Sequence, residues 1–180
     1  IKVRNLSTGK NLRDTLRDTD GDVVWTADSS GFFYVLMDDN HRPCRVYHHR
    51  LGDLQAKDRL VFEETDSRWF VRIGETQSGD FATVEIEDHE TSETLLIDLH
   101  NPDAPMLVVE PRQPKLRYDV DHLAVRVGGM VYPAVAVDAT GEVAARGFAF
   151  AWLIVAGRSD VMPGDLSLRE TFAAIVPRAP

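Results

Sequence analysis

The chain has 180 residues, of which 43% are hydrophobic, and its 20 Lys and Arg against 29 Asp and Glu give a formal net charge of -9. Its length is that of one domain with a real core, and its acidity disfavours general nucleic-acid binding, which depends on clustered Lys and Arg. One cysteine, Cys44, excludes an internal disulfide framework, and no apolar run approaches the roughly 20 residues of a membrane helix. We therefore expect a soluble cytoplasmic domain with no nucleic-acid partner, membrane partner or cofactor.

Short apolar bursts with a period near two recur along the chain, a pattern typical of strands. They span residues 1–4, 23–25, 32–37, 45–49, 60–62, 70–73, 82–86, 94–98, 106–109, 116–120, 123–127, 132–138, 148–155 and 167–169. Polar segments at residues 28–31, 77–80, 101–103, 140–141 and 163–165 predict turns between them. Connections this short allow hairpins, so the sequence predicts an antiparallel all-β fold.

The sequence does not decide the secondary structure of two C-terminal segments. Residues 144–155 form an apolar run that favours a strand over a short helix, and residues 168–176 allow either.

A weak internal repeat favours one all-β architecture. Similar turn-and-strand segments align Phe32, Phe81 and Leu123, at offsets of 49 and 42 residues. This period is close to that of a four-stranded β-propeller blade, although an irregular two-sheet sandwich is the alternative. We expect about three blades in residues 1–127, and a further divergent blade with a C-terminal segment in residues 128–180.

Several segments, in order, resemble the propeller of the prolyl oligopeptidase family of serine peptidases, and most closely its oligopeptidase B branch. They read VRNLSTG at 3–9, VWTADSSGFFYV at 24–35, RVYHHRLG at 45–52, DRLVFEE at 58–64 and YDVDH at 118–122. The likeness weakens after residue 127, although residues 147–155 and 166–169 still resemble a later blade. The region between His122 and Gly147 is shorter than the family pattern.

The resemblance implies a non-catalytic role for this chain. In the family a Ser-His-Asp triad lies in a separate α/β-hydrolase domain of the same polypeptide, and the propeller admits short peptides while excluding folded proteins. The nearest match to a nucleophile elbow, GRSDV at 157–161, has Val161 where the sharp turn needs glycine, so Ser159 is expected to be a turn residue. We predict no catalytic and no cofactor-binding residue here.

The remaining reactive side chains indicate structural roles. His48 and His49 point to opposite faces of a strand and cannot chelate one metal together, so no metal site is expected. Cys44 is expected to be an exposed or half-buried thiol, and His122 beside Asp121 a structural turn residue. Gly128 and Gly129 indicate a hairpin turn and not a phosphate loop.

Two acidic clusters are candidates for electrostatic steering of basic peptides. They comprise Glu63, Glu64, Asp66, Glu85, Glu87 and Asp88. The alternative is that they are solvated loop residues, which the sequence alone favours.

The length predicts an incomplete architecture, since roughly four blades fall short of the family's seven. Open sheet edges favour self-association, and Ile1 in place of an initiator Met indicates a piece of a longer protein. A second hypothesis is a stand-alone propeller or sandwich that acts as an interaction module. In a third, residues 128–180 belong to a hydrolase domain.

Overall fold

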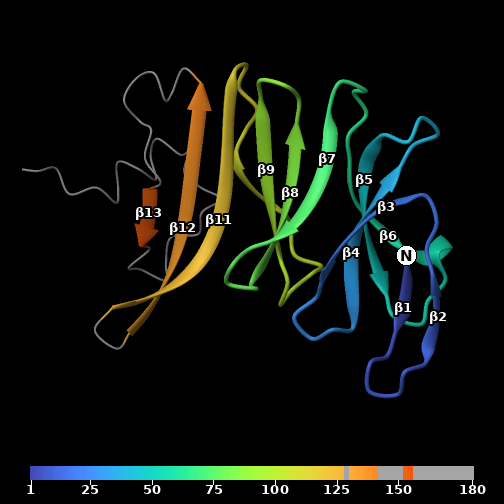
Figure 1. Cartoon of the computed structure of the whole chain (residues 1–180). Helices are drawn as coiled ribbons and strands as arrows, with labels where there is room; N and C mark the ends of the chain where they lie inside the picture. The colour runs from blue at the N-terminus through green and yellow to red at the C-terminus, as the bar shows by residue number, and fades with distance from the viewer. Residues whose placement is uncertain (128–129, 142–151, 156–180) are drawn as a thin grey trace, which may run out of the picture.

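The computed structural model describes residues 1–127, 130–141 and 152–155, and Figure 1 shows its strands gathered into sheets that follow one another side by side. Apart from the short 3-10 helix η1 (Gln55–Lys57), every regular element in these ranges is a strand. No helix in this part of the chain is long and apolar enough to cross a membrane.

The strands form four sheets in chain order. The N-terminal pair consists of β1 (Lys2–Arg4) and β2 (Asn11–Thr15). The first four-stranded sheet has the order β3 (Thr19–Trp25), β4 (Gly31–Met37), β5 (Pro43–Arg50) and β6 (Arg59–Glu63). The second has the order β7 (Phe70–Glu75), β8 (Phe81–Glu87), β9 (Ser92–Asp98) and β10 (Leu107–Glu110). The three-stranded sheet has the order β11 (Leu116–Val127), β12 (Met130–Gly141) and β13 (Trp152–Val155).

Consecutive strands pair antiparallel in every sheet, which confirms the predicted all-β fold. Two four-stranded sheets in succession match the predicted blades. The strand predicted within residues 144–155 is present as β13 over Trp152–Val155.

The first four-stranded sheet is buried on both faces. In β4, Phe33 and Val35 belong to a core shared with the second four-stranded sheet, whereas Phe32 and Tyr34 pack against the N-terminal pair. Successive side chains of a strand point to opposite faces, so an uninterrupted apolar run suits a strand between two neighbours. This explains the sequence FFYV, in which all four side chains are buried.

The second four-stranded sheet has one apolar face and one polar face. Ala82, Val84 and Ile86 of β8 belong to the core shared with the first sheet. On the side of β11, buried Ser92 and Thr94 bond to Tyr118. Its junction with the three-stranded sheet is therefore built from hydrogen bonds as well as apolar contact.

The predicted repeat is confirmed for its first two copies, with a corrected register. In both turns a threonine side chain bonds to the carbonyl five residues later, from Thr26 to Gly31 and from Thr76 to Phe81. Residues Ser29 and Gly79 have positive φ values of 56° and 74°. Equivalent positions are thus 50 residues apart, so Phe81 corresponds to Gly31 and not to Phe32.

The prediction of a third copy of the repeat is wrong. Residues 116–120 and 123–127 were expected to be two strands, but they form the single strand β11 of 12 residues. Asp121 and His122 lie within this strand because the turn of the second sheet supplies their partners: Gln77 N donates to the Asp121 carboxylate, and Ser78 Oγ bonds to His122 Nδ1.

Other expectations are corrected or lie outside the described residues. Strand β2, with the sequence NLRDT, was not predicted because it has no apolar burst. The segments at 128–129, 142–151 and 156–180 lie outside the described residues, and with them Gly128, Gly129, Ser159 and the predicted strand at 167–169.

Candidate functional site at the joints between the sheets

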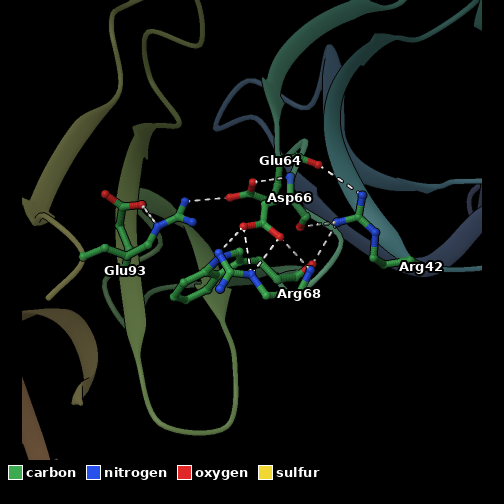
Figure 2. Close-up of polar contacts among 7 residues, drawn as sticks. Arg42, Glu64, Asp66, Arg68 and Glu93 are labelled. Atoms are coloured by element: carbon green, nitrogen blue, oxygen red, sulfur yellow. Dashed lines mark hydrogen bonds and ion pairs between the residues drawn. The ribbon is translucent and has the colours of Figure 1, made fainter. Parts of the chain in front are cut away.

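One arginine fixes the connection between the two four-stranded sheets. Arg42, in the loop between β4 and β5, donates from Nη1 to the carbonyl oxygens of Asp66 at 3.1 Å and Trp69 at 2.9 Å. Its Nη2 donates to the carbonyl oxygen of Glu64 at 3.3 Å, and its Nε pairs with Asp38 at 3.1 Å. Figure 2 shows this guanidinium beside the connecting segment. A guanidinium has five donors in a rigid fork, so one side chain can hold three carbonyl groups in register.

A second arginine reaches the same connection from beyond the second sheet. Arg112, in the segment that leads to β11, donates to Glu64 Oε2 at 2.7 Å and to Glu93 Oε2 at 2.8 Å. Its guanidinium also lies over the Trp69 ring. Glu64 is buried, so loss of Arg112 would leave its carboxylate away from water without a cationic partner. Arg42 and Arg112 together tie both four-stranded sheets to the chain that enters the third.

Most of the predicted steering residues have arginine partners. Glu63 pairs with Arg45, Glu64 with Arg112, Asp66 with Arg68, and Glu87 with both Arg72 and Arg117. The hydrogen bonds from Arg68 lower the pKa of Asp66 to about 2.

The carboxylates of the other two predicted steering residues accept hydrogen bonds from neutral groups. Glu85 accepts a hydrogen bond from Thr83, and Asp88 accepts from the backbone of Glu90 and Thr91. The six acids do not form one cluster: three lie in β6 and the connection after it, and three in or directly after β8.

A serine, a histidine and an aspartate meet at the junction between the second and third sheets, but not as a catalytic triad. Ser78 Oγ lies 2.7 Å from His122 Nδ1, and Asp80 Oδ2 lies 3.8 Å from the same nitrogen. A triad needs the nucleophile on one ring nitrogen and the carboxylate on the other. Ser78 also accepts from the Asp80 backbone, as a turn residue does. This geometry does not generate a nucleophile.

A buried ionisable cluster, which the sequence did not indicate, lies between the N-terminal pair and the first sheet. His49 is fully buried, with Nε2 at 3.0 Å from Asp14 Oδ1 and Nδ1 at 2.8 Å from Asp58 Oδ1. Asp58 Oδ2 accepts from the Tyr34 hydroxyl at 2.9 Å. Asp14 and His49 are separated by 35 residues, too far for a local motif to pair them.

The structure places the histidines and the cysteine that were considered for metal and thiol chemistry. Within the described ranges, no three His, Cys, Asp or Glu side chains gather so that they could hold a metal ion. His48 and His49 do point to opposite faces, since His48 stacks on Phe33 and His49 contacts Phe32. The expectation of an exposed or half-buried Cys44 is wrong. Pro43 begins β5, so Cys44 is the next strand residue and points inward, and burial raises the pKa of its thiol.

Comparisons with known proteins agree on one family. The family model described as prolyl oligopeptidase, N-terminal beta-propeller domain, matches residues 1–126. Protease 2 from Moraxella lacunata is 35% identical over 124 residues, which are 68% of this chain and 18% of that protein. Dipeptidyl aminopeptidase BI from Pseudoxanthomonas mexicana is 32% identical over 127 residues, which are 70% of this chain and 17% of the relative. The chain therefore spans less than a fifth of the length of these relatives.

Solved structures show the same fold. Oligopeptidase B from Leishmania major matches with a TM-score of 0.64 at 21% identity, over 86% of this chain and 22% of that one. Oligopeptidase B from Trypanosoma brucei matches with a TM-score of 0.60 at 24% identity, over 82% and 22% of the two chains. The four-stranded sheets are thus propeller blades, and the chain belongs to the family of prolyl oligopeptidase N-terminal β-propeller domains.

Proposed function

We propose that this chain is the non-catalytic propeller portion of an oligopeptidase, and that it limits access to the active site by size. The observation that carries the proposal is the family match over residues 1–126, supported by relatives that are named as peptidases. The partner in this proposal is an α/β-hydrolase domain in the same polypeptide. That the chain spans only 18% of its relative from Moraxella lacunata is in keeping with a larger parent protein.

Steric exclusion is the proposed mechanism. Neighbouring blades share an apolar core and are tied by Arg42 and Arg112, so separating them would expose apolar surface and leave buried Glu64 without its partner. A short peptide can pass a narrow opening that a folded protein cannot enter. The blades therefore act as a rigid sieve.

The filter is tested with one cleavage sequence presented in two ways. In the whole protein that contains this chain, kcat/KM is measured for a short peptide and for the same sequence in a loop of a folded protein. We expect cleavage of the peptide only. Equal cleavage of both substrates would rule out the size filter, and an inactive whole protein would rule out the peptidase assignment.

Electrostatic steering of basic peptides is a second part of the proposal. It is supported by the net charge of -9, since long-range attraction depends on summed charge and salt screens it. Glu85 and Asp88 are the residues to alter, because neutral groups donate the hydrogen bonds to their carboxylates. Glu85→Gln with Asp88→Asn should lower kcat/KM for a basic peptide at low salt and leave a neutral peptide unaffected. Equal effects on both peptides would contradict steering.

Self-association and a cytoplasmic location complete the proposal. Among the described residues, the N-terminal pair has two strands, each with a side that has no neighbouring strand in its sheet. Such edges pair readily with other chains. Light scattering of the 180-residue chain should show a concentration-dependent increase in mass, whereas a constant monomer mass would contradict it. Cell fractionation tests the location.

A further inference from the structure

The junction between the N-terminal pair and the first four-stranded sheet contains an ionisable centre. Its apolar part comprises Val3, Leu16, Phe32 and Tyr34. Within this junction, His49 of β5 faces Asp14 of β2 on one side and Asp58, directly after η1, on the other. All three side chains are almost completely buried, with exposed fractions of 1–2%.

The hydrogen-bond partners determine where the protons lie. Burial would raise the pKa of Asp14, but hydrogen bonds from Gly52 N–H and from His49 outweigh it and lower the pKa below 3.8. Burial and the contact with Asp58 raise the pKa of Tyr34, so the Tyr34 hydroxyl keeps its proton and donates to Asp58. When Asp58 is ionised as well, both acids accept and both ring nitrogens of His49 donate, which only an imidazolium can do.

Loss of one proton from His49 would leave a ring lone pair facing a buried carboxylate. Neither group could then reach water, and an unsatisfied buried acceptor costs free energy. Other ionisable groups in the junction are Tyr47, which stacks on Tyr34, and the amino group of Ile1, which donates to the carbonyl of Leu16. His48 points to the opposite face of β5. In this structure no further ionisable side chain is recorded bonding to the three.

We propose that Asp14, His49 and Asp58 form a protonation-sensitive joint, which holds the N-terminal pair against the first blade while His49 carries both protons and loosens when one is lost. The joint connects elements that are far apart in sequence, and the N-terminal pair has few other polar ties to the blade. They include the reciprocal bonds between Arg17 and Gln55, the bond from Gly52 to Asp14, and the backbone bond from Met37 to Asp18. The expected motion is local, because the core between the two blades does not include these residues.

Hydrogen exchange measures the joint directly. Protection factors, corrected for intrinsic exchange, are compared between about pH 5 and about pH 9, the range that brackets ordinary histidine titration. Asp14 stays ionised throughout, because its pKa is below 3.8. We expect amides of β1 and β2 to lose protection by about tenfold or more as the pH rises, the scale of one unsatisfied buried group. Amides of β8 and β9 serve as the internal reference, and their protection factors should not change relative to each other.

Asp58→Asn is the matched variant. Its amide nitrogen would replace Oδ1 and donate to His49 Nδ1, while its oxygen would replace Oδ2 and accept from Tyr34. A neutral His49 can then donate from Nε2 to Asp14, so every bond is kept without an imidazolium. Protection of β1 and β2 in this variant should be independent of pH. His48→Phe removes the neighbouring histidine, keeps the stacking on Phe33, and should retain the wild-type pH dependence.

Several experimental results would overturn the proposal. Protection in the wild type that does not change with pH, or Asp58→Asn behaving like the wild type, would overturn the joint. If Asp58→Asn does not fold, the nitrogen-15 spectrum of the His49 ring in the wild type decides. It should show both nitrogens protonated where protection is high and one deprotonated where protection falls. A neutral ring in the fully protected state would also overturn the proposal.

Discussion

The guanidinium of Arg112 lies 4.3 Å from the centre of the Trp69 ring, and this contact joins the segment after the second blade to the segment before it. The same guanidinium pairs with Glu64 and Glu93. Stacking and ion pairing thus act on one side chain, at a point where three consecutive parts of the chain meet. We expect the stability of the junctions between blades to depend on such residues more than on the number of surface ion pairs.

Arg112→Ala should therefore destabilise the chain. It leaves Glu64 buried without its cationic partner and removes the contact with Trp69, so we expect a loss of about 2–4 kcal/mol, below the full cost for a completely buried pair because Arg112 is partly exposed. Urea unfolding measures the free energy. Arg68→Ala is the control, because its pair with Asp66 is exposed, and its unfolding midpoint should stay unchanged. Equal losses in the two variants would show that the burial of Glu64 is unimportant.

Ile86→Ala should also be costly. Ile86 is fully buried in the core that the two four-stranded blades share, and truncation of such a residue costs about 2–5 kcal/mol. Val108→Ala, at a side chain that is 41% exposed, should change stability by less than about 0.5 kcal/mol. Thermal unfolding of both variants tests this, and a small effect at Ile86 would contradict the shared core.

Tyr118→Phe tests the polar junction with the third sheet. The Tyr118 hydroxyl donates to the carbonyl of Glu110 and accepts from the backbone N–H of buried Thr94. Its loss leaves a buried donor without a partner, at a cost of about 1–3 kcal/mol. Tyr47→Phe, whose hydroxyl has no recorded bond in the described structure, should be nearly neutral in the same denaturant titration. The reverse order of effects would be inconsistent with the structure.

Ser29 and Gly79 provide reciprocal variants at equivalent turn positions. Both residues have positive φ, which costs a non-glycine residue about 1–2 kcal/mol. Gly79→Ala should destabilise by about 1 kcal/mol. Ser29→Gly relieves the strain and should stabilise by about 0.5 kcal/mol, a smaller amount because glycine loses more backbone entropy on folding. Opposite signs in chemical denaturation would confirm that these positions correspond, 50 residues apart.

His48 should make the chain less stable in mild acid. Burial lowers its pKa below the ordinary value for histidine, so the unfolded state binds the proton more readily. Its contribution is complete above about pH 6.5 and is lost as the pH falls through the window below it. Urea midpoints at about pH 7.5 and about pH 5.5 should differ more for the wild type than for His48→Phe. This direction is opposite to that of the proposed joint at His49, which loosens at high pH.

Local sequence patterns were sufficient to predict the class of fold and the family. Alternating apolar residues predicted the strands because burial of one or both faces of a strand is written into consecutive residues. Strand β2 was not predicted and β11 was predicted as two strands, in both cases because polar side chains obscured the strand pattern. In NLRDT the apolar signal is too weak, and in β11 the polar Asp121 and His122 indicated a turn, although a neighbouring blade satisfies them.

The antiparallel all-β architecture, the blade-like repeat and membership of a propeller family could be predicted from the sequence, since they depend on the order and spacing of residues along the chain. The pairing of charged residues became visible in the folded chain alone. Glu64 and Arg112 are 48 residues apart, and Asp14 and His49 are 35 apart. The strength of an ionic contact depends on distance and burial in three dimensions, and a linear pattern of residues contains neither quantity. Glu64 and Asp66, predicted from sequence as steering residues, are for this reason found paired with arginines at the joint between two blades.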